Sequence, residues 1–85
     1  MMQAMKVEII TPEMQQTWED VSLVQLPGTD GLFEVLKGHA PLIAALGNGK
    51  AKIEVSGETK WFVLKGGVVE VLNDLIRIMT ESCEG

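Results

Sequence analysis

Turn-forming residues interrupt this chain at such short intervals that no helix-length segment remains between them. The 85 residues include nine glycines and three prolines, together with turn pairs such as Asn73-Asp74. These residues mark turns because glycine accepts a positive φ and proline fixes φ at about −65°. The runs between the turns are rich in Val, Ile, Leu and aromatic residues, which favour strands. The sequence therefore predicts an all-β fold.

Alternation of apolar and polar residues locates individual strands. In the segment 50–55 the odd-numbered residues are apolar and the even-numbered residues are charged, so one face is expected to be buried. Ile76 and Ile78 share one face of the segment 75–80 in the same way. By contrast, the segments 42–46 and 61–64 are apolar on both faces.

The number of strands limits the possible architectures. Eight or nine short strands with turns between them are typical of an antiparallel sandwich or barrel. Two of them, 17–20 and 21–26, follow each other directly. At this length we expect a single domain, residues 1–85, with a thin core.

Charge and cysteine content exclude several classes of protein. The net charge is −5 and the seven basic residues are scattered, whereas a nucleic-acid-binding surface needs clustered Lys and Arg. A single cysteine, Cys83, excludes a disulfide-built secreted mini-protein. No apolar run is long enough to cross a bilayer, and the N-terminus lacks the features of a signal peptide. We therefore expect an intracellular chain, or one on the inner side of a membrane.

The sequence offers no catalytic, cofactor-binding or metal-binding residues. Gly49-Lys50 matches the end of a phosphate-binding loop, but the first glycine and the final Ser or Thr of that motif are missing. One histidine and one cysteine are too few for a structural zinc site, and the serines lie in no nucleophile motif. An enzyme is therefore the weakest hypothesis.

The most informative stretch is 26–46, in which two turns flank a short strand. The first turn, 27–31, has the composition of an exposed loop pinned by Pro and Gly. Just after it, Phe33 is expected in the core and Leu32 on the opposite face as an exposed apolar contact. The second turn places His39 before Ala-Pro. We expect its ring to hydrogen-bond nearby backbone; the functional alternative is that it shapes a loop that docks on a partner.

This stretch, with Gly-His-Ala-Pro-Leu at 38–42, resembles the signature of the epsilon subunit of the rotary F-type ATP synthase. The segment Gly-Gly-Val-Val-Glu-Val at 66–71 is similar to a second motif of that family, and the resemblance extends over nearly the whole chain. It implies a flattened β-sandwich of about ten short strands at the foot of the central rotor stalk, without an active site. Such a subunit would couple proton flow to ATP synthesis, as a peripheral membrane protein on the cytoplasmic face of the cell inner membrane.

The resemblance also implies two contact surfaces. One would face the c-ring of the membrane sector and consists of Pro27, Gly28, Thr29, Asp30, Gly31, Leu32 and Phe33. The other would lie near the gamma subunit and consists of His39, Ala40, Pro41, Leu42, Ile43 and Ala44. No cofactor, nucleotide or nucleic acid is implied for this domain, and no direct membrane insertion.

The chain departs from the family pattern at several positions, two of which bring in a charged residue. Glu34 stands where the family usually has glycine, and Lys37 stands where it usually has proline. The family also usually continues into a C-terminal helical hairpin, which carries the inhibitory movement and, in some members, ATP binding. That hairpin is not part of these residues, so neither property is expected of them. The alternative to this family is a β-sandwich interaction module unrelated to ATP synthase.

Overall fold

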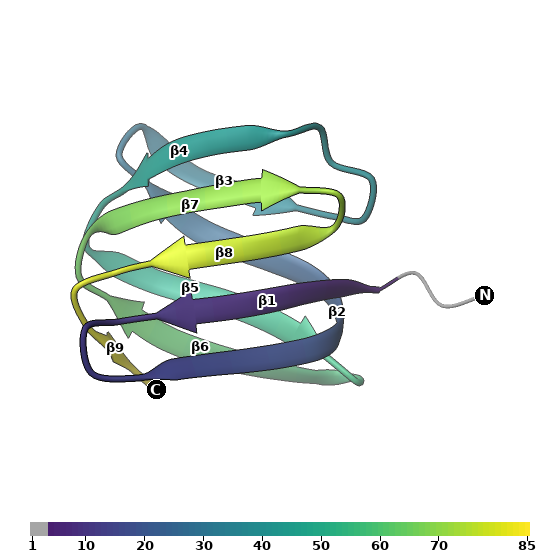
Figure 1. The fold of residues 1–85 in the computed structure, drawn as a ribbon, viewed down its shortest axis with the longest axis horizontal. Helices are drawn as coiled ribbons and strands as arrows, with labels where there is room; N and C mark the ends of the chain where they lie inside the picture. Colours follow the sequence, from purple (N-terminus) through teal and green to yellow (C-terminus); the bar gives the residue numbers. More distant parts are fainter. Residues whose placement is uncertain (1–3) are drawn as a thin grey trace.

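The computed structural model describes residues 4–85, which form strands joined by short turns (Figure 1). No helix occurs within these residues, and the all-β prediction is confirmed. The resemblance implied about ten strands, whereas nine lie in the described part of the chain. They are β1 (Met5–Ile10), β2 (Gln15–Gly28), β3 (Gly31–Val35), β4 (Leu42–Leu46), β5 (Gly49–Val55), β6 (Glu58–Leu64), β7 (Gly67–Leu72), β8 (Leu75–Met79) and β9 (Cys83–Glu84).

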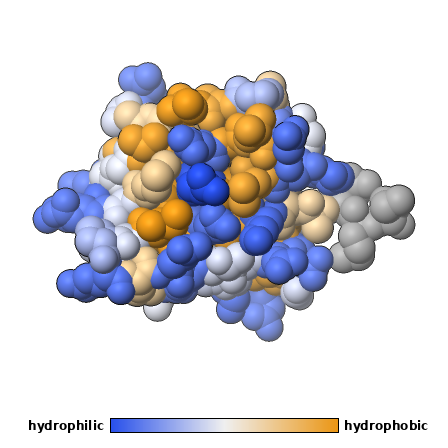
Figure 2. All heavy atoms as spheres, in the orientation of Figure 1, coloured by the Kyte–Doolittle hydropathy of each residue, from blue (hydrophilic) through white to orange (hydrophobic). Residues whose placement is uncertain are grey.

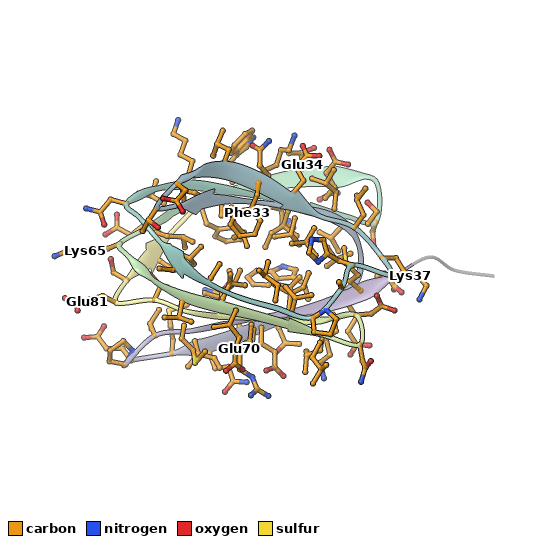
Figure 3. The ribbon with its side chains drawn as sticks, turned by 90° about the horizontal axis from the view of Figure 1, so that it is seen from above. Phe33, Glu34, Lys37, Lys65, Glu70 and Glu81 are labelled. Atoms are coloured by element: carbon orange, nitrogen blue, oxygen red, sulfur yellow. The ribbon has the colours of Figure 1, made fainter. Side chains whose placement is uncertain are left out.

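The strands are hydrogen-bonded into one sheet that folds over itself into two layers. The order is β1-β8-β7-β4-β2-β5-β6-β9, with β3 paired to β2 and β1 paired to β2 as well. Figure 3 shows the two layers edge-on, with side chains filling the space between them. Every pairing is antiparallel except β1 with β8, which is parallel. This parallel pair was not predicted from the sequence, because it joins strands from the two ends of the chain rather than neighbours through a turn.

The two strands expected at 17–20 and 21–26 are one strand, β2, of 14 residues. The first half of β2 pairs with β1 and the second half pairs with β3 and β5. Asp20, at the join, has a φ of 60°, and the pairing register shifts between Val21 and Leu23. A bulge bends a strand without ending it, so β2 passes from one layer to the other and contributes to both.

The core lies between the layers and follows the predicted alternation. The odd-numbered residues of β5 are buried, as are Ile76 and Ile78 of β8, which confirms both predictions. Trp18 packs against Phe62 with ring centroids 5.1 Å apart, and Phe33 points inward and packs against the core (Figure 3). The apolar segments 42–46 and 61–64 are buried on one face only.

Candidate interaction surfaces

The tip between β2 and β3 is the first predicted contact surface. Thr29 and Asp30 form the tip, and Gly28 pairs with Gly31 across it. Gly31 has a φ of 126°, which favours glycine. A Cβ on Gly28 would lie 2.8 Å from the carbonyl oxygen of Gly31, so this glycine permits the close approach of the two strands. The Pro-Gly pattern therefore produces a tight, well-defined tip.

The seven residues predicted for this surface divide into exposed and supporting groups. Thr29, Asp30 and Gly31 are exposed, and Leu32 is 66% exposed, as expected for an apolar contact. Pro27 is buried, which corrects the expectation that the whole turn is exposed. The carbonyl oxygen of Pro27 accepts a hydrogen bond of 2.8 Å from the backbone N–H of Gly47, in the loop after β4. Gly49, at the start of β5, packs against the proline ring.

The loop between β3 and β4 carries the start of the second predicted surface. His39, Ala40 and Pro41 are exposed. The backbone N–H of His39 donates to the carbonyl oxygen of Leu36 at 3.1 Å, and its ring Nδ1 lies 2.7 Å from the carbonyl oxygen of Ala40. The expectation that the ring hydrogen-bonds nearby backbone is confirmed.

An aspartate from a distant turn fixes this loop. The backbone N–H of Gly38 donates to Oδ1 of Asp74 at 2.8 Å, and Lys37 Nζ lies 2.7 Å from Oδ2. The Gly38 hydrogen bond, followed by that of Lys37, holds the pKa of the Asp74 carboxyl below its ordinary value. Asp74 and Asn73 both have positive φ, 64° and 52°, in the turn between β7 and β8. The sequence indicated that turn but not its role in anchoring a second loop.

The rest of the second surface lies on strand β4, whose side chains alternate between the core and the outer face. Leu42 and Ala44 are half-buried and pack against the core, whereas Ile43 is 73% exposed. Ile43 lies on an outer face with exposed apolar side chains of β7, Val68 and Leu72. Figure 2 shows this face: hydrophobic residues gather over β4, β7 and β8, with hydrophilic residues at the centre.

We call this surface the β4–β7–β8 face. The strand pairings place its outward-facing side chains in rows, because Ile43 is opposite Glu70, and Glu70 is opposite Arg77. Ile43 was predicted from the sequence, whereas the other members were not. The alternation within 67–72 could have identified Val68, Glu70 and Leu72, since Val69 and Val71 are buried and their neighbours face outward. The face consists of Ile43, Ala45, Val68, Glu70, Leu72 and Arg77.

The structure brings parts of the two predicted segments together. The backbone N–H of Thr29 donates to the carbonyl oxygen of Ala45 at 3.1 Å, so the β2–β3 tip adjoins the end of β4. Residues 28–33 and 43–45 line a shared surface depression of about 530 Å³. The loop with His39 lies at the other end of β4, where it contacts the β7–β8 turn. The second segment therefore runs from this loop along β4 toward the β2–β3 tip.

Within residues 4–85 two further polar side chains, Thr80 and Cys83, lie wholly or partly inside the fold. Thr80 is buried, and its hydroxyl lies within 3.2 Å of three backbone carbonyl oxygens. Cys83 is half-buried, and burial raises the pKa of its thiol. This part of the chain holds no group of three His, Cys, Asp or Glu side chains placed to bind a metal ion. It also contains no helix of the length and hydrophobicity needed to span a membrane.

Comparison with known proteins identifies the family. Residues 4–85 match the model for the β-sandwich domain of the ATP synthase delta/epsilon chain. The chain is 40% identical over 79 residues to the ATP synthase epsilon chain of Chlorobium limicola, covering 92% of this chain and 90% of that protein. It is 38% identical over 80 residues to the epsilon chain of Solibacter usitatus, covering 94% of this chain but 60% of that protein.

Solved structures show the same fold. A chain of the Euglena gracilis mitochondrial ATP synthase superposes with a TM-score of 0.89 at 19% identity, covering 95% of this chain and 52% of that one. A chain in a structure of the central stalk and c-ring of the Tetrahymena thermophila enzyme has a TM-score of 0.79 at 20% identity, covering 93% and 64%. The family match excludes the alternative, an interaction module unrelated to ATP synthase. This chain belongs to the ATP synthase delta/epsilon family, as a β-sandwich domain of that non-catalytic subunit.

Proposed function

We propose that this chain is a rotor-stalk subunit of the F-type ATP synthase that links the gamma subunit to the c-ring and so couples proton flow to ATP synthesis. The observation that carries the proposal is a β-sandwich with an exposed polar tip between β2 and β3 and an exposed apolar face over β4, β7 and β8. Its relatives are named ATP synthase epsilon chains, and one structural neighbour comes from a structure of the central stalk and c-ring.

The β2–β3 tip is the proposed contact with the c-ring. Thr29, Asp30 and Gly31 project from the end of the molecule, and Leu32 adds an apolar side chain beside them. The tip is tied back to the body by the hydrogen bond from Thr29 to Ala45. A loop held in this way loses little conformational entropy on docking, which suits a permanent contact.

The proposed contact with the gamma subunit is the exposed part of the second segment. Ile43 presents a large apolar side chain to solvent, and His39, Ala40 and Pro41 continue the surface along the loop. Leu42 and Ala44 hold β4 in place from the core side. An exposed apolar surface of this kind is typical of protein–protein contacts. In the assembled enzyme the subunit would lie at the membrane, on its cytoplasmic face.

The test is assembly of the full chain with the gamma subunit and c-ring of its own ATP synthase. Asp30→Lys, or Thr29→Trp, is expected to weaken attachment to the c-ring, and Ile43→Asp is expected to weaken gamma binding by about tenfold or more. Glu58→Lys makes the same change of charge as Asp30→Lys at the distant β5–β6 turn and serves as the control.

Thermal melts of the variants separate loss of binding from loss of folding. All four side chains are exposed, so their melting temperatures are expected to stay close to that of the parent chain. Unimpaired assembly of both the Thr29→Trp and Ile43→Asp variants would refute the two-surface proposal.

A further inference from the structure

Glu70 occupies the middle of the β4–β7–β8 face. Its neighbours across the two strand pairings are Ile43 on β4 and Arg77 on β8. Its side chain is 44% exposed and points away from the interior (Figure 3). A carboxylate therefore stands at the centre of a surface whose other exposed members on β4 and β7 are apolar.

The charges on this face leave Glu70 incompletely neutralised. Arg77 lies between two carboxylates, with its Nε 3.2 Å from Glu8 Oε1 and its Nη1 3.9 Å from Glu70 Oε1. The shorter and better hydrogen-bonded contact is the one with Glu8. Lys6 is the basic side chain of β1. It is opposite Leu75 of β8, so strand β8 lies between Lys6 and Glu70. The Arg77 guanidinium therefore pairs with two carboxylates, and its interaction with Glu70 is the weaker of the two.

Apolar depressions flank Glu70 on both sides. One, of about 270 Å³, is lined by Pro41, Leu42, Ile43, Glu70, Val71 and Leu72. The other, of about 150 Å³, is lined by Glu70, Leu72, Leu75 and Arg77. Both depressions share Glu70 and Leu72, so a side chain that reached the carboxylate would have apolar neighbours in either.

We infer that the whole β4–β7–β8 face, and not only the segment 39–44, docks on the gamma subunit, and that Glu70 receives a Lys or Arg side chain of that partner. The inference rests on the proposed function. A carboxylate covered by a partner is strongly destabilising unless an opposite charge pairs with it. A basic side chain set in an apolar surface is therefore the complement of this face.

The broad side of the flattened sandwich is large enough for a stable contact. The Cα extents of the described residues are 35 × 23 × 19 Å, so this whole side, of which the β4–β7–β8 face is a part, covers roughly 800 Å² in projection. This is about the area that each partner contributes to an interface of standard size. The segment 39–44 alone covers only one edge of that area.

The experiment compares gamma binding by two isosteric variants of the full chain, Glu70→Gln and Glu34→Gln. Glu34 is an exposed glutamate on the opposite outer face, as Figure 3 shows, and is the matched control. We expect Glu70→Gln to weaken binding by about tenfold or more and to reduce the dependence of affinity on salt, because an ion pair is removed. Glu34→Gln is expected to leave the affinity and its salt dependence unchanged.

A third variant, Ile43→Asp, separates this inference from the proposed function. If Ile43→Asp abolishes binding while Glu70→Gln binds as the parent chain does, the basic partner of Glu70 is wrong and the gamma surface stands. If neither variant changes binding, the gamma surface itself is wrong. We expect Glu70→Gln and the parent chain to have equal melting temperatures, because Arg77 keeps its ion pair with Glu8. Equal melting temperatures would show that any loss of affinity arises in the interface and not from unfolding.

Discussion

The substitution Gly67→Ala is expected to destabilise the domain strongly although it adds a single methyl group. Gly67 begins β7 with a φ of 125°. A Cβ at this position would collide with the carbonyl oxygen of Met79 and lie 2.9 Å from the Cα of Thr80. Both atoms belong to the backbone at the end of β8, which is hydrogen-bonded to β1 and β7, so they cannot move aside like the end of a flexible side chain.

The expected magnitude has two parts. A left-handed φ costs a non-glycine residue about 1–2 kcal/mol, and forcing an extra carbon into a packed site costs about 1–3 kcal/mol more. The free energy of unfolding should therefore fall by about 2–5 kcal/mol. For a domain of this size each kcal/mol lowers the melting temperature by about 4–8 °C, so a fall of at least about 8 °C is expected.

Gly57→Ala is the matched control for this prediction. Gly57 also has a positive φ, 80°, but a Cβ there would meet no atom within 4 Å. This variant should lose only the conformational part, about 1–2 kcal/mol. Urea unfolding and thermal melts of both variants measure the difference. If Gly67→Ala is no less stable than Gly57→Ala, the close approach of β7 and the end of β8 is not present in solution.

Three further predictions concern the core and the anchored loop. Ile53→Ala removes most of a fully buried side chain and should lower the free energy of unfolding by about 2–5 kcal/mol in urea. Asp74→Gly suits the positive φ but removes both contacts to the loop, so the Gly38 amide should exchange with solvent faster than in Asp74→Asn, which keeps an acceptor oxygen; equal exchange rates would contradict the anchor. Because the pKa of Asp74 is below its ordinary value of 3.8, the anchor should persist above about pH 4 and weaken as the pH falls through the lowered pKa. The amide chemical shift of Gly38 reports this change, and a shift that stays constant as the pH falls through that range would contradict the anchor.

The parts of the fold that depend on local pattern could be predicted from the sequence. The alternation in 50–55 correctly placed β5, and the turn pairs correctly separated the strands around it. The single long β2 was missed because a bulge at Asp20 leaves the same local signal as a break between two strands. The parallel β1–β8 pair was missed because it depends on contacts between the two ends of the chain.

For the candidate surfaces, too, local features could be predicted from the sequence, whereas features that depend on distant segments could not. Exposure of Leu32 followed from its place after a tight turn, and the hydrogen bond of the His39 ring followed from its loop. Burial of Pro27 did not follow, because the atoms that cover it come from the loop after β4 and from β5. The rows that place Glu70 beside Arg77 exist only once the strands are paired, so no local pattern could reveal them.

Site-directed photo-crosslinking in the assembled ATP synthase tests the central proposal most directly. Cys83→Ser removes the native thiol, and Asp30→Cys or Ile43→Cys then places a thiol-attached photoactive probe on one surface at a time. The account predicts that the probe at position 30 captures a c subunit and that the probe at position 43 captures gamma. Capture of the same subunit from both positions, or of neither subunit from either, would contradict it.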